Sequence, residues 1–224
     1  MKKLGFTLAE VLITLAIIGV VATITLPSLM SNTQEQQAVT AFRKAMNTLN
    51  EVPQMNAAVD GFDYGGIAIV TAPSDRDVYD ANGLLEQSIW AMFASKAQVD
   101  VTKSGSAGAM HPNCGNFGTN ANVIAFRDGT MLCYSSITRT IDRPNAVIRA
   151  LVDTNGIKAP NQLSTCRDPN CADKSQKRIR DQFEVTLYKT MALPGRIEVS
   201  DNGTIGDSTM NVPQTHAARW AMSK

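Results

Sequence analysis

The chain begins with a long apolar segment, and its hydrophobic pattern changes after Met30. Between Leu4 and Leu29 the sequence LGFTLAEVLITLAIIGVVATITLPSL contains one charged residue, Glu10. A helix over residues 6–30 would be about 37 Å long at about 1.5 Å per residue, whereas the hydrocarbon core of a bilayer is about 30 Å thick. The pattern therefore predicts a membrane-spanning helix with a carboxylate near its N-terminal end.

Beyond the apolar segment the chain follows the pattern of an amphipathic helix. Four apolar residues are spaced by 3, 4 and 3 positions, which puts them on one helix face: Val39, Phe42, Met46 and Leu49. Pro53 is expected to end this helix, because proline has no N–H to donate within it. A second helix with an apolar face is predicted over residues 83–98.

The second half of the chain alternates apolar and polar residues, as β-strands do. Residues 122–136, NVIAFRDGTMLCYSS, predict two strands joined by a tight turn at Asp128-Gly129. Further short strands are predicted over residues 146–152, 183–189 and 196–199, and a final short helix over residues 216–222. Three or more antiparallel strands packed on an amphipathic helix form a stable unit, so the predicted fold class is α+β.

The charge balance gives no support for nucleic-acid binding. The chain has 21 basic and 20 acidic residues, and without Lys2, Lys3 and Glu10 the remainder is neutral. A neutral protein has no long-range field that attracts a polyanion. We interpret one local basic cluster as a solvated loop rather than a DNA- or partner-binding patch: Lys174, Lys177, Arg178 and Arg180.

Four cysteines stand at positions 114, 133, 166 and 171. An even number in a chain with an export-type N-terminus is typical of two disulfides, for which three pairings are possible. We favour Cys166–Cys171, which closes a short loop, together with Cys114–Cys133. Free thiols and a four-thiolate zinc site are the alternatives, although the spacing lacks the CxxC pairs usual in such zinc sites.

The lysines before the apolar segment indicate its orientation. Lys2 and Lys3 place the N-terminus in the cytoplasm and the rest of the chain outside it. A conventional secretory signal would be cut after small residues such as Val20-Val21-Ala22, whereas a signal anchor would be kept whole. A cleaved signal would leave a secreted, disulfide-bonded binding module or enzyme.

The segment LGFTLAEVLITLAIIGVVA also resembles the N-terminal motif of type IV prepilins and type II secretion pseudopilins. Gly5 and Phe6 match the cleavage pair of that family, and Glu10 matches its acidic residue. Gly19 and Pro27 match positions that loosen the helix. The resemblance implies cleavage between Gly5 and Phe6, followed by N-methylation of Phe6.

The resemblance further implies a structural subunit rather than an enzyme. Its expected parts are a leader peptide (1–5), a transmembrane and assembly helix (6–30), and a pilin-like α+β head that includes the second half of the long helix (31–224). Its expected partners are a prepilin peptidase, other pilins or pseudopilins, and an assembly platform with its ATPase. The subunit would cross the cytoplasmic membrane once, with its head outside, and then enter a type IV pilus or a type II secretion pseudopilus.

Elementary electrostatics gives Glu10 a role in this scheme. A lone carboxylate in a membrane helix costs about 2.5–3.5 kcal/mol on insertion scales, so it needs a partner. Cleavage after Gly5 creates an ammonium group on Phe6, which lies one helical turn from Glu10. The carboxylate is expected to pair with this amine in its own chain or in the next subunit, where a wrong register would leave a buried charge unpaired.

One loop has residues that suit a metal ion. Asp153, Asn155 and Asp181 are weak calcium candidates, because calcium prefers hard oxygen ligands. The alternative is an Asx-turn, in which Asp153 and Asn155 bond the backbone and Gly156 takes a positive φ. No other cofactor is predicted.

Overall fold

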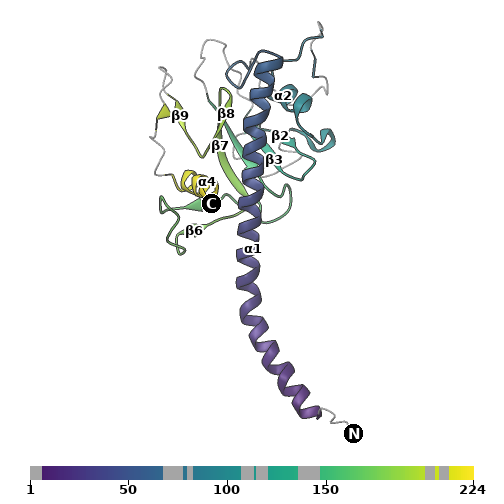
Figure 1. Cartoon of the computed structure of the whole chain (residues 1–224), viewed down its shortest axis with the longest axis vertical. Helices are drawn as coiled ribbons and strands as arrows, with labels where there is room; N and C mark the ends of the chain where they lie inside the picture. The colour runs from purple at the N-terminus through teal and green to yellow at the C-terminus, as the bar shows by residue number, and fades with distance from the viewer. Residues whose placement is uncertain are drawn as a thin grey trace. The chain divides into compact units, whose positions relative to one another are not determined.

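The structure is a computed structural model that divides the chain into two compact units, Met1–Gln37 and Ala38–Lys224 (Figure 1). Helix α1, Leu8–Val59, runs through both of them. Gly5 and Phe6, the predicted cleavage pair, lie outside the described residues. The residues that the structure describes are 7–67, 78–79, 83–106, 114, 121–135, 147–199, 205–206 and 212–224.

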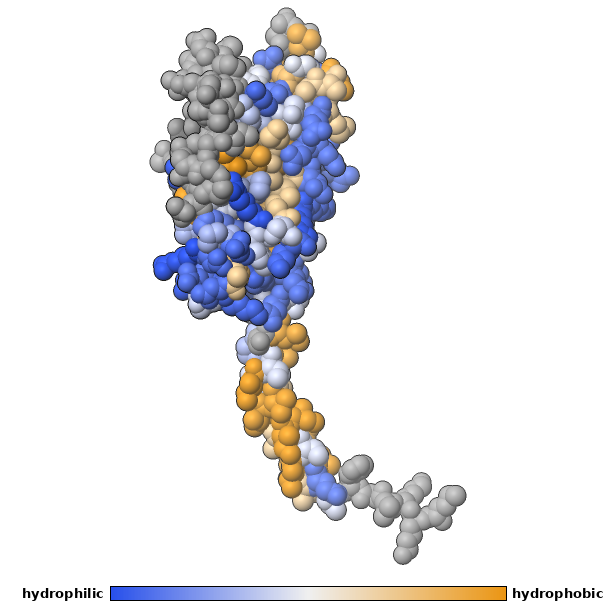
Figure 2. All heavy atoms as spheres, turned by 60° about the vertical axis from the view of Figure 1, so that its left-hand side comes forward, coloured by the Kyte–Doolittle hydropathy of each residue, from blue (hydrophilic) through white to orange (hydrophobic). Residues whose placement is uncertain are grey.

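The first unit contains the apolar half of α1. Large apolar side chains are exposed along this segment, and they form the orange surface of the narrow part in Figure 2: Leu8, Leu12, Ile13, Leu15, Ile17, Ile18, Val20, Ile24 and Leu29. The segment is long and apolar enough to cross a membrane, and its most apolar window has no buried residue. The helix continues through Pro27 without interruption.

In the second unit α1 packs on the head through the predicted stripe. Val39, Phe42, Met46 and Leu49 are all buried. The ring of Phe42 stacks on that of Phe183, with centroids 4.2 Å apart. The predicted amphipathic helix is therefore confirmed, and its apolar face forms part of the main core.

The prediction that Pro53 ends the helix is wrong, since α1 continues to Val59. A proline inside a helix leaves the carbonyl four residues earlier without its N–H donor. Here that carbonyl belongs to Leu49, and the Tyr64 hydroxyl donates to it at 2.7 Å. The buried Tyr64 side chain thus supplies the hydrogen bond that Pro53 cannot, and the helix has no need to stop.

The head contains a six-stranded antiparallel sheet in the order β1-β2-β3-β4-β7-β8. Its second and third strands form the predicted hairpin, in which Asp128 Oδ1 accepts the Thr130 N–H at 3.0 Å and Gly129 has a φ of +94°. The α+β fold class is confirmed. The strands are β1 (Gly105–Ser106), β2 (Ala121–Ala125), β3 (Met131–Ser135), β4 (Ile148–Asp153), β7 (Gln182–Tyr188) and β8 (Met191–Pro194).

Strand alternation divides the apolar residues of this sheet between two cores. One face contributes to the main core with α1 and includes Leu132, Tyr134 and Phe183. The other face forms a smaller core that includes Val123 and Cys133. The central strands are therefore buried on both sides.

Three predicted boundaries differ from the structure. Helix α2, Ile89–Lys96, begins later than predicted because Ser88 caps it, with Ser88 Oγ accepting the Ala91 N–H at 3.0 Å. The edge strand beside β7 is β8, which follows β7 after a two-residue turn, and residues 196–199 do not pair with the main sheet. Instead, β9 (Glu198–Val199) pairs with β10 (Ile205–Gly206) in a separate two-stranded sheet.

A C-terminal layer completes the head. Helix α4, Pro213–Ser223, confirms the predicted final helix and lies against β5 (Thr165–Cys166) and β7. Strand β5 pairs with β6 (Lys177–Arg178) in a short ribbon. The Arg43 side chain of α1 donates from Nε to the Ala221 carbonyl at 2.8 Å, which ties α4 to the long helix. A 3-10 turn, η1 (Val101–Lys103), precedes β1.

Candidate functional site

Glu10, the charged residue of the apolar segment, has its carboxylate bound by the start of its own helix. The Thr7 backbone N–H and the Thr7 hydroxyl both donate to Glu10 Oε2, each at 2.8 Å. In return, the Glu10 N–H donates to Thr7 Oγ1 at 3.3 Å. This reciprocal arrangement is a capping box, in which the residue before a helix and the third residue within it satisfy each other's N–H groups.

The capping box was missed in the sequence interpretation, which considered Glu10 only as a charge that needs a cation. The signal was present, because TLAE at residues 7–10 has the S/T-x-x-E pattern of a capping box. A carboxylate in the first turn also lies at the positive end of the helix dipole. The cost of placing Glu10 at the edge of a membrane is therefore reduced before any cation reaches it.

Three threonine hydroxyls of the apolar segment are satisfied by their own helix. Thr14 donates to the Val11 carbonyl at 3.0 Å, and Thr23 donates to the Val20 carbonyl at 2.8 Å. Thr25 donates to the carbonyl of Val21, also within its own helix. These three hydroxyls are thus bonded within the helix, and the large apolar side chains of the segment are exposed.

Gly19 and Pro27, the other predicted assembly residues, both lie within α1. A Cβ atom at Gly19 would meet no other atom within 4 Å, so packing within this chain does not require a glycine there. Pro27 has no N–H to offer the Thr23 carbonyl. Their roles in assembly stay predictions.

The four cysteines form the two disulfides that the sequence favoured. Cys114 pairs with Cys133 and Cys166 with Cys171, each with 5.7 Å between Cα atoms, a separation usual for disulfides. No cysteine is free, so neither the zinc site nor the free thiols are present.

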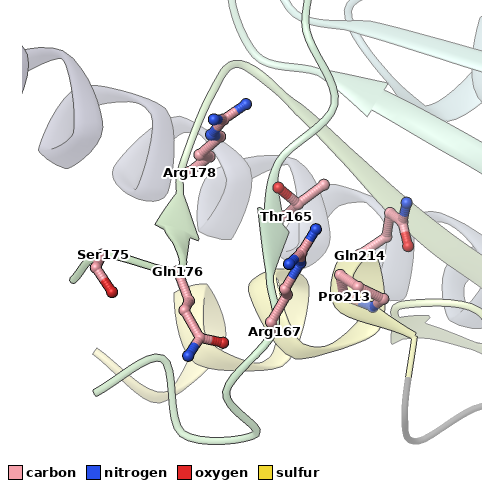
Figure 3. A pocket seen from close by; sticks show the side chains of 7 residues that line it. All are labelled: Thr165, Arg167, Ser175, Gln176, Arg178, Pro213 and Gln214. Atoms are coloured by element: carbon pink, nitrogen blue, oxygen red, sulfur yellow. The ribbon is translucent and has the colours of Figure 1, made fainter. Parts of the chain in front are cut away.

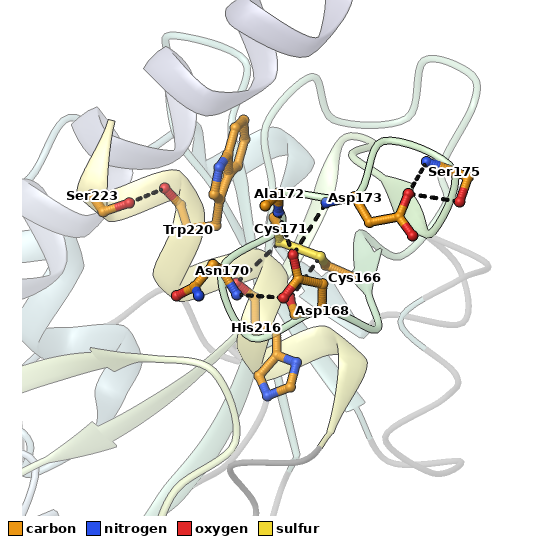
Figure 4. Close-up of a disulfide and its surroundings, with 10 residues drawn as sticks. All are labelled: Cys166, Asp168, Asn170, Cys171, Ala172, Asp173, Ser175, His216, Trp220 and Ser223. Carbon is orange, nitrogen blue, oxygen red and sulfur yellow. Dashed lines mark hydrogen bonds between the residues drawn. A yellow bond between two sulfur atoms is a disulfide. The ribbon is translucent and has the colours of Figure 1, made fainter.

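The Cys166–Cys171 disulfide closes a loop that is organised around Asp168 (Figure 4). The Asp168 carboxylate accepts the backbone N–H groups of Asn170, Ala172 and Asp173. These hydrogen bonds, with that of Asn170 the strongest influence, lower the pKa of Asp168. The loop therefore has a defined conformation, although Asp168 is only half-buried.

The two carboxylates among the calcium candidates accept hydrogen bonds within the head, whereas Asn155 Oδ1 is buried without a partner among the described residues. Asp181 accepts the backbone N–H groups of Asn161 and Gln162, at 2.8 and 2.9 Å. Asp153 accepts the Asn155 N–H at 3.1 Å and the Gln182 side-chain amide at 2.9 Å. The first of these two bonds is the Asx-turn of the alternative interpretation.

The loop after this turn supports the same interpretation. Gly156 has a φ of +70°, as the Asx-turn interpretation requires. Among the residues that the structure describes, no group of three or more His, Cys, Asp or Glu side chains gathers to hold a metal. Calcium binding stays a prediction.

Comparison with known proteins bears on the N-terminal segment above all. Residues 1–26 match the family described as the prokaryotic N-terminal methylation motif. The chain is also 34% identical over 79 residues to the type II secretion system core protein G of Vibrio cholerae serotype O1, a match over 34% of this chain and 54% of that protein. The match thus spans about half the length of this relative. No solved structure matches the chain.

These findings and the fold define a pilin-like chain: a methylation-motif N-terminus, a long helix with an apolar first half, and an α+β head. The resemblance to the prepilin and pseudopilin family, first seen in the residues around Glu10, is confirmed by both matches, the first of which covers that segment.

Proposed function

We propose that this chain is a structural pilin or pseudopilin subunit that polymerises through the apolar half of α1. The observation that carries the proposal is the exposure of the apolar side chains of that segment together with the cap at Glu10. Its apolar side chains are exposed along its length, while Glu10 is held at its N-terminal end by Thr7. An apolar surface of this size needs to be covered. Lipid covers it while the subunit is stored in the membrane, and the helices of neighbouring subunits cover it in the filament.

Processing adds the cation that completes the Glu10 site. We propose that a prepilin peptidase cuts between Gly5 and Phe6 and that Phe6 is then N-methylated. The new ammonium group belongs to Phe6, which precedes Thr7 in the sequence, and Thr7 already holds the carboxylate with which we expect that group to pair. Pairing in an environment of low dielectric favours the correct register between subunits, because a misplaced neighbour leaves a charge unpaired.

The topology and partners of the subunit follow from this scheme. Lys2 and Lys3 favour a cytoplasmic N-terminus, so that α1 crosses the cytoplasmic membrane once and the disulfide-bonded head lies outside. The expected partners are the peptidase, other pilins or pseudopilins, and an assembly platform whose ATPase supplies the energy. The similarity to a core protein of a type II secretion system favours a pseudopilus over a pilus.

Mass spectrometry of the N-terminus of the full chain, purified from membranes, tests the proposal. We expect a mature chain that begins at N-methylated Phe6. A chain that begins near Thr23 would contradict it and support a secreted module with a conventional signal peptide. An intact chain that begins at Met1 would contradict processing.

A further inference from the structure

A hollow of about 340 Å³ lies between the β5–β6 ribbon and the beginning of α4 (Figure 3). Two arginines are among the residues that line it, and no carboxylate does: Thr165, Arg167, Ser175, Gln176, Arg178, Pro213 and Gln214. The hollow belongs entirely to the head and has no part in the function proposed above. Its lining is rich in hydrogen-bond donors and in positive charge.

The ribbon brings the two guanidinium groups to one face. Thr165 and Arg178 are direct partners across the ribbon. Arg167 lies two residues after Thr165, and its N–H donates to the carbonyl of Gln176. Because side chains alternate between the faces of a strand, Thr165, Arg167 and Arg178 share one face.

The opposite face of the ribbon is fixed to the rest of the head. Cys166 is fully buried and bonded to Cys171. The Lys177 ammonium lies 3.7 Å from the ring centroid of Trp220 in α4, a favourable cation–π contact. The hollow is therefore held in shape by covalent and aromatic contacts, which reduces the entropy lost when a ligand is bound.

Several polar groups in the hollow are unused, and one of them, Gln214 Oε1, is an acceptor. Within the described part of the chain, neither Arg167 nor Arg178 forms an ion pair, and the Thr165 hydroxyl forms no hydrogen bond. Gln214 Oε1 is buried without a partner among the same residues. Helix α4 begins beside it at Pro213 with no side-chain cap, so the positive end of its dipole adds to the charge.

One negative charge lies beside the hollow. Asp173 accepts the Ser175 hydroxyl at 2.7 Å and the Gln176 amide at 3.0 Å. These two lining residues are thereby partly occupied. The remaining donors are the two guanidinium groups, the Thr165 hydroxyl and the Gln214 amide.

We propose that this hollow is an oxyanion site that binds a phosphate group. Guanidinium groups donate paired hydrogen bonds to the oxygens of a phosphate, and such charge-assisted bonds are the strong ones. The Thr165 hydroxyl and the Gln214 amide supply further donors. The P–OH group of inorganic hydrogen phosphate can donate to Gln214 Oε1, and in a phosphodiester headgroup a glycerol hydroxyl can do so instead. The phosphate comes either from solution or from the headgroup of an anionic lipid.

Calorimetric titration of the full chain in a neutral detergent, at constant ionic strength, tests the proposal. Inorganic phosphate is one probe, and glycerophosphoglycerol, the deacylated headgroup of an anionic lipid, is the other. The test variant is Arg167→Gln/Arg178→Gln. The control is Lys174→Gln/Arg180→Gln, which removes the same charge from exposed residues that do not line the hollow.

We expect saturable binding of at least one probe, weakened at least tenfold in the test variant and less than threefold in the control. Binding of inorganic phosphate would identify dissolved phosphate as the source, and binding of glycerophosphoglycerol alone would identify the lipid headgroup. If neither probe bound saturably, the proposed phosphate site would be overturned. Equal losses in the two variants would also overturn it, because they would show attraction to net charge only.

Discussion

At the scale of single residues, Glu10 has one observed interaction, the cap with Thr7, and one proposed interaction, the pairing with the amine of Phe6. The cap with Thr7 requires only an oxygen that accepts hydrogen bonds, whereas pairing with the amine of Phe6 requires a negative charge. A carboxylate supplies both. Substitutions at position 10 can therefore distinguish the effect of capping on the start of the helix from the effect of charge pairing on the register between subunits.

We expect Glu10→Gln to keep the cap and lose the charge, and Glu10→Ala to lose both. Both variants should enter the membrane normally, since each removes a charge from an apolar segment. Incorporation into filaments should fall at least tenfold in both variants if charge pairing sets the register. Comparison of the sheared filament fraction with the membrane fraction measures this. Normal incorporation of Glu10→Gln would show that capping alone accounts for Glu10.

Two buried tyrosines make the stability of the head dependent on alkaline pH. Burial raises the pKa of Tyr64 and of Tyr134 above the ordinary value. Both groups keep their protons in the folded chain, whereas an unfolded chain releases them above about pH 10. Their contribution to stability is complete below that pH and declines above it, by up to about 1.4 kcal/mol per pH unit for each tyrosine.

Tyr134→Phe tests this dependence. The Tyr134 hydroxyl has no hydrogen-bond partner among the described residues, so its removal should leave stability at pH 7 unchanged or slightly higher. Above pH 10 the variant should lose stability less steeply than the unsubstituted chain. Thermal unfolding at pH 7, 10 and 11, followed by near-UV circular dichroism, gives the comparison. Equal losses in both chains would contradict the role of Tyr134.

At the scale of elements, Tyr64 allows α1 to pass through Pro53. Tyr64→Phe should destabilise the head by about 1–3 kcal/mol, the cost of a buried carbonyl that loses its hydrogen bond. Pro53→Ala restores an N–H that can donate to the Leu49 carbonyl. The double variant should therefore recover most of the loss, as denaturant unfolding of the four chains would show. A loss in the double variant equal to that of Tyr64→Phe alone would contradict this account.

Elements with strong local patterns were predictable from the sequence. The stripe of α1, the hairpin with its Asp128-Gly129 turn, and the final helix all depend on residues close together in the chain. The length of α1 was not predictable from local pattern, because the donor that replaces the missing N–H of Pro53 comes from Tyr64. Nor was the environment of Asp181, whose partners precede it by 19 and 20 residues. In these two cases prediction failed because a distant residue completes a hydrogen bond, whereas the Thr7–Glu10 cap and the Ser88 cap are local patterns that were overlooked.

The calcium hypothesis can be tested at Asp153 and Asp181. In the Asx-turn interpretation, Asp153 and Asp181 stabilise the head through hydrogen bonds, and millimolar calcium should not shift the thermal midpoint of the full chain. A calcium site would raise it, and Asp153→Asn would abolish the rise. Thermal scans with calcium and with EDTA distinguish the two. A calcium-dependent rise that Asp153→Asn removes would replace the Asx-turn interpretation.

At the scale of the whole molecule, the two halves of α1 have different tasks. The described residues of the first 30 include none that is buried, whereas α1 contributes to the main core of the head from Ala38 onward. Stability and assembly should therefore be separable. In the proposed function, the apolar half of α1 supplies a surface for lipid and for neighbouring subunits without adding to the core.

Deletion of residues 1–30 tests this separation. We expect the remaining chain to keep the thermal midpoint of the head, since no buried side chain is lost, and to be absent from both the membrane and filament fractions. Glu10→Gln is the matched control, because it should remain in the membrane while failing to assemble. A large fall in the thermal midpoint on deletion would mean that the apolar half supports the fold of the head. Filaments formed by the shortened chain would mean that the head, rather than α1, holds the subunits together.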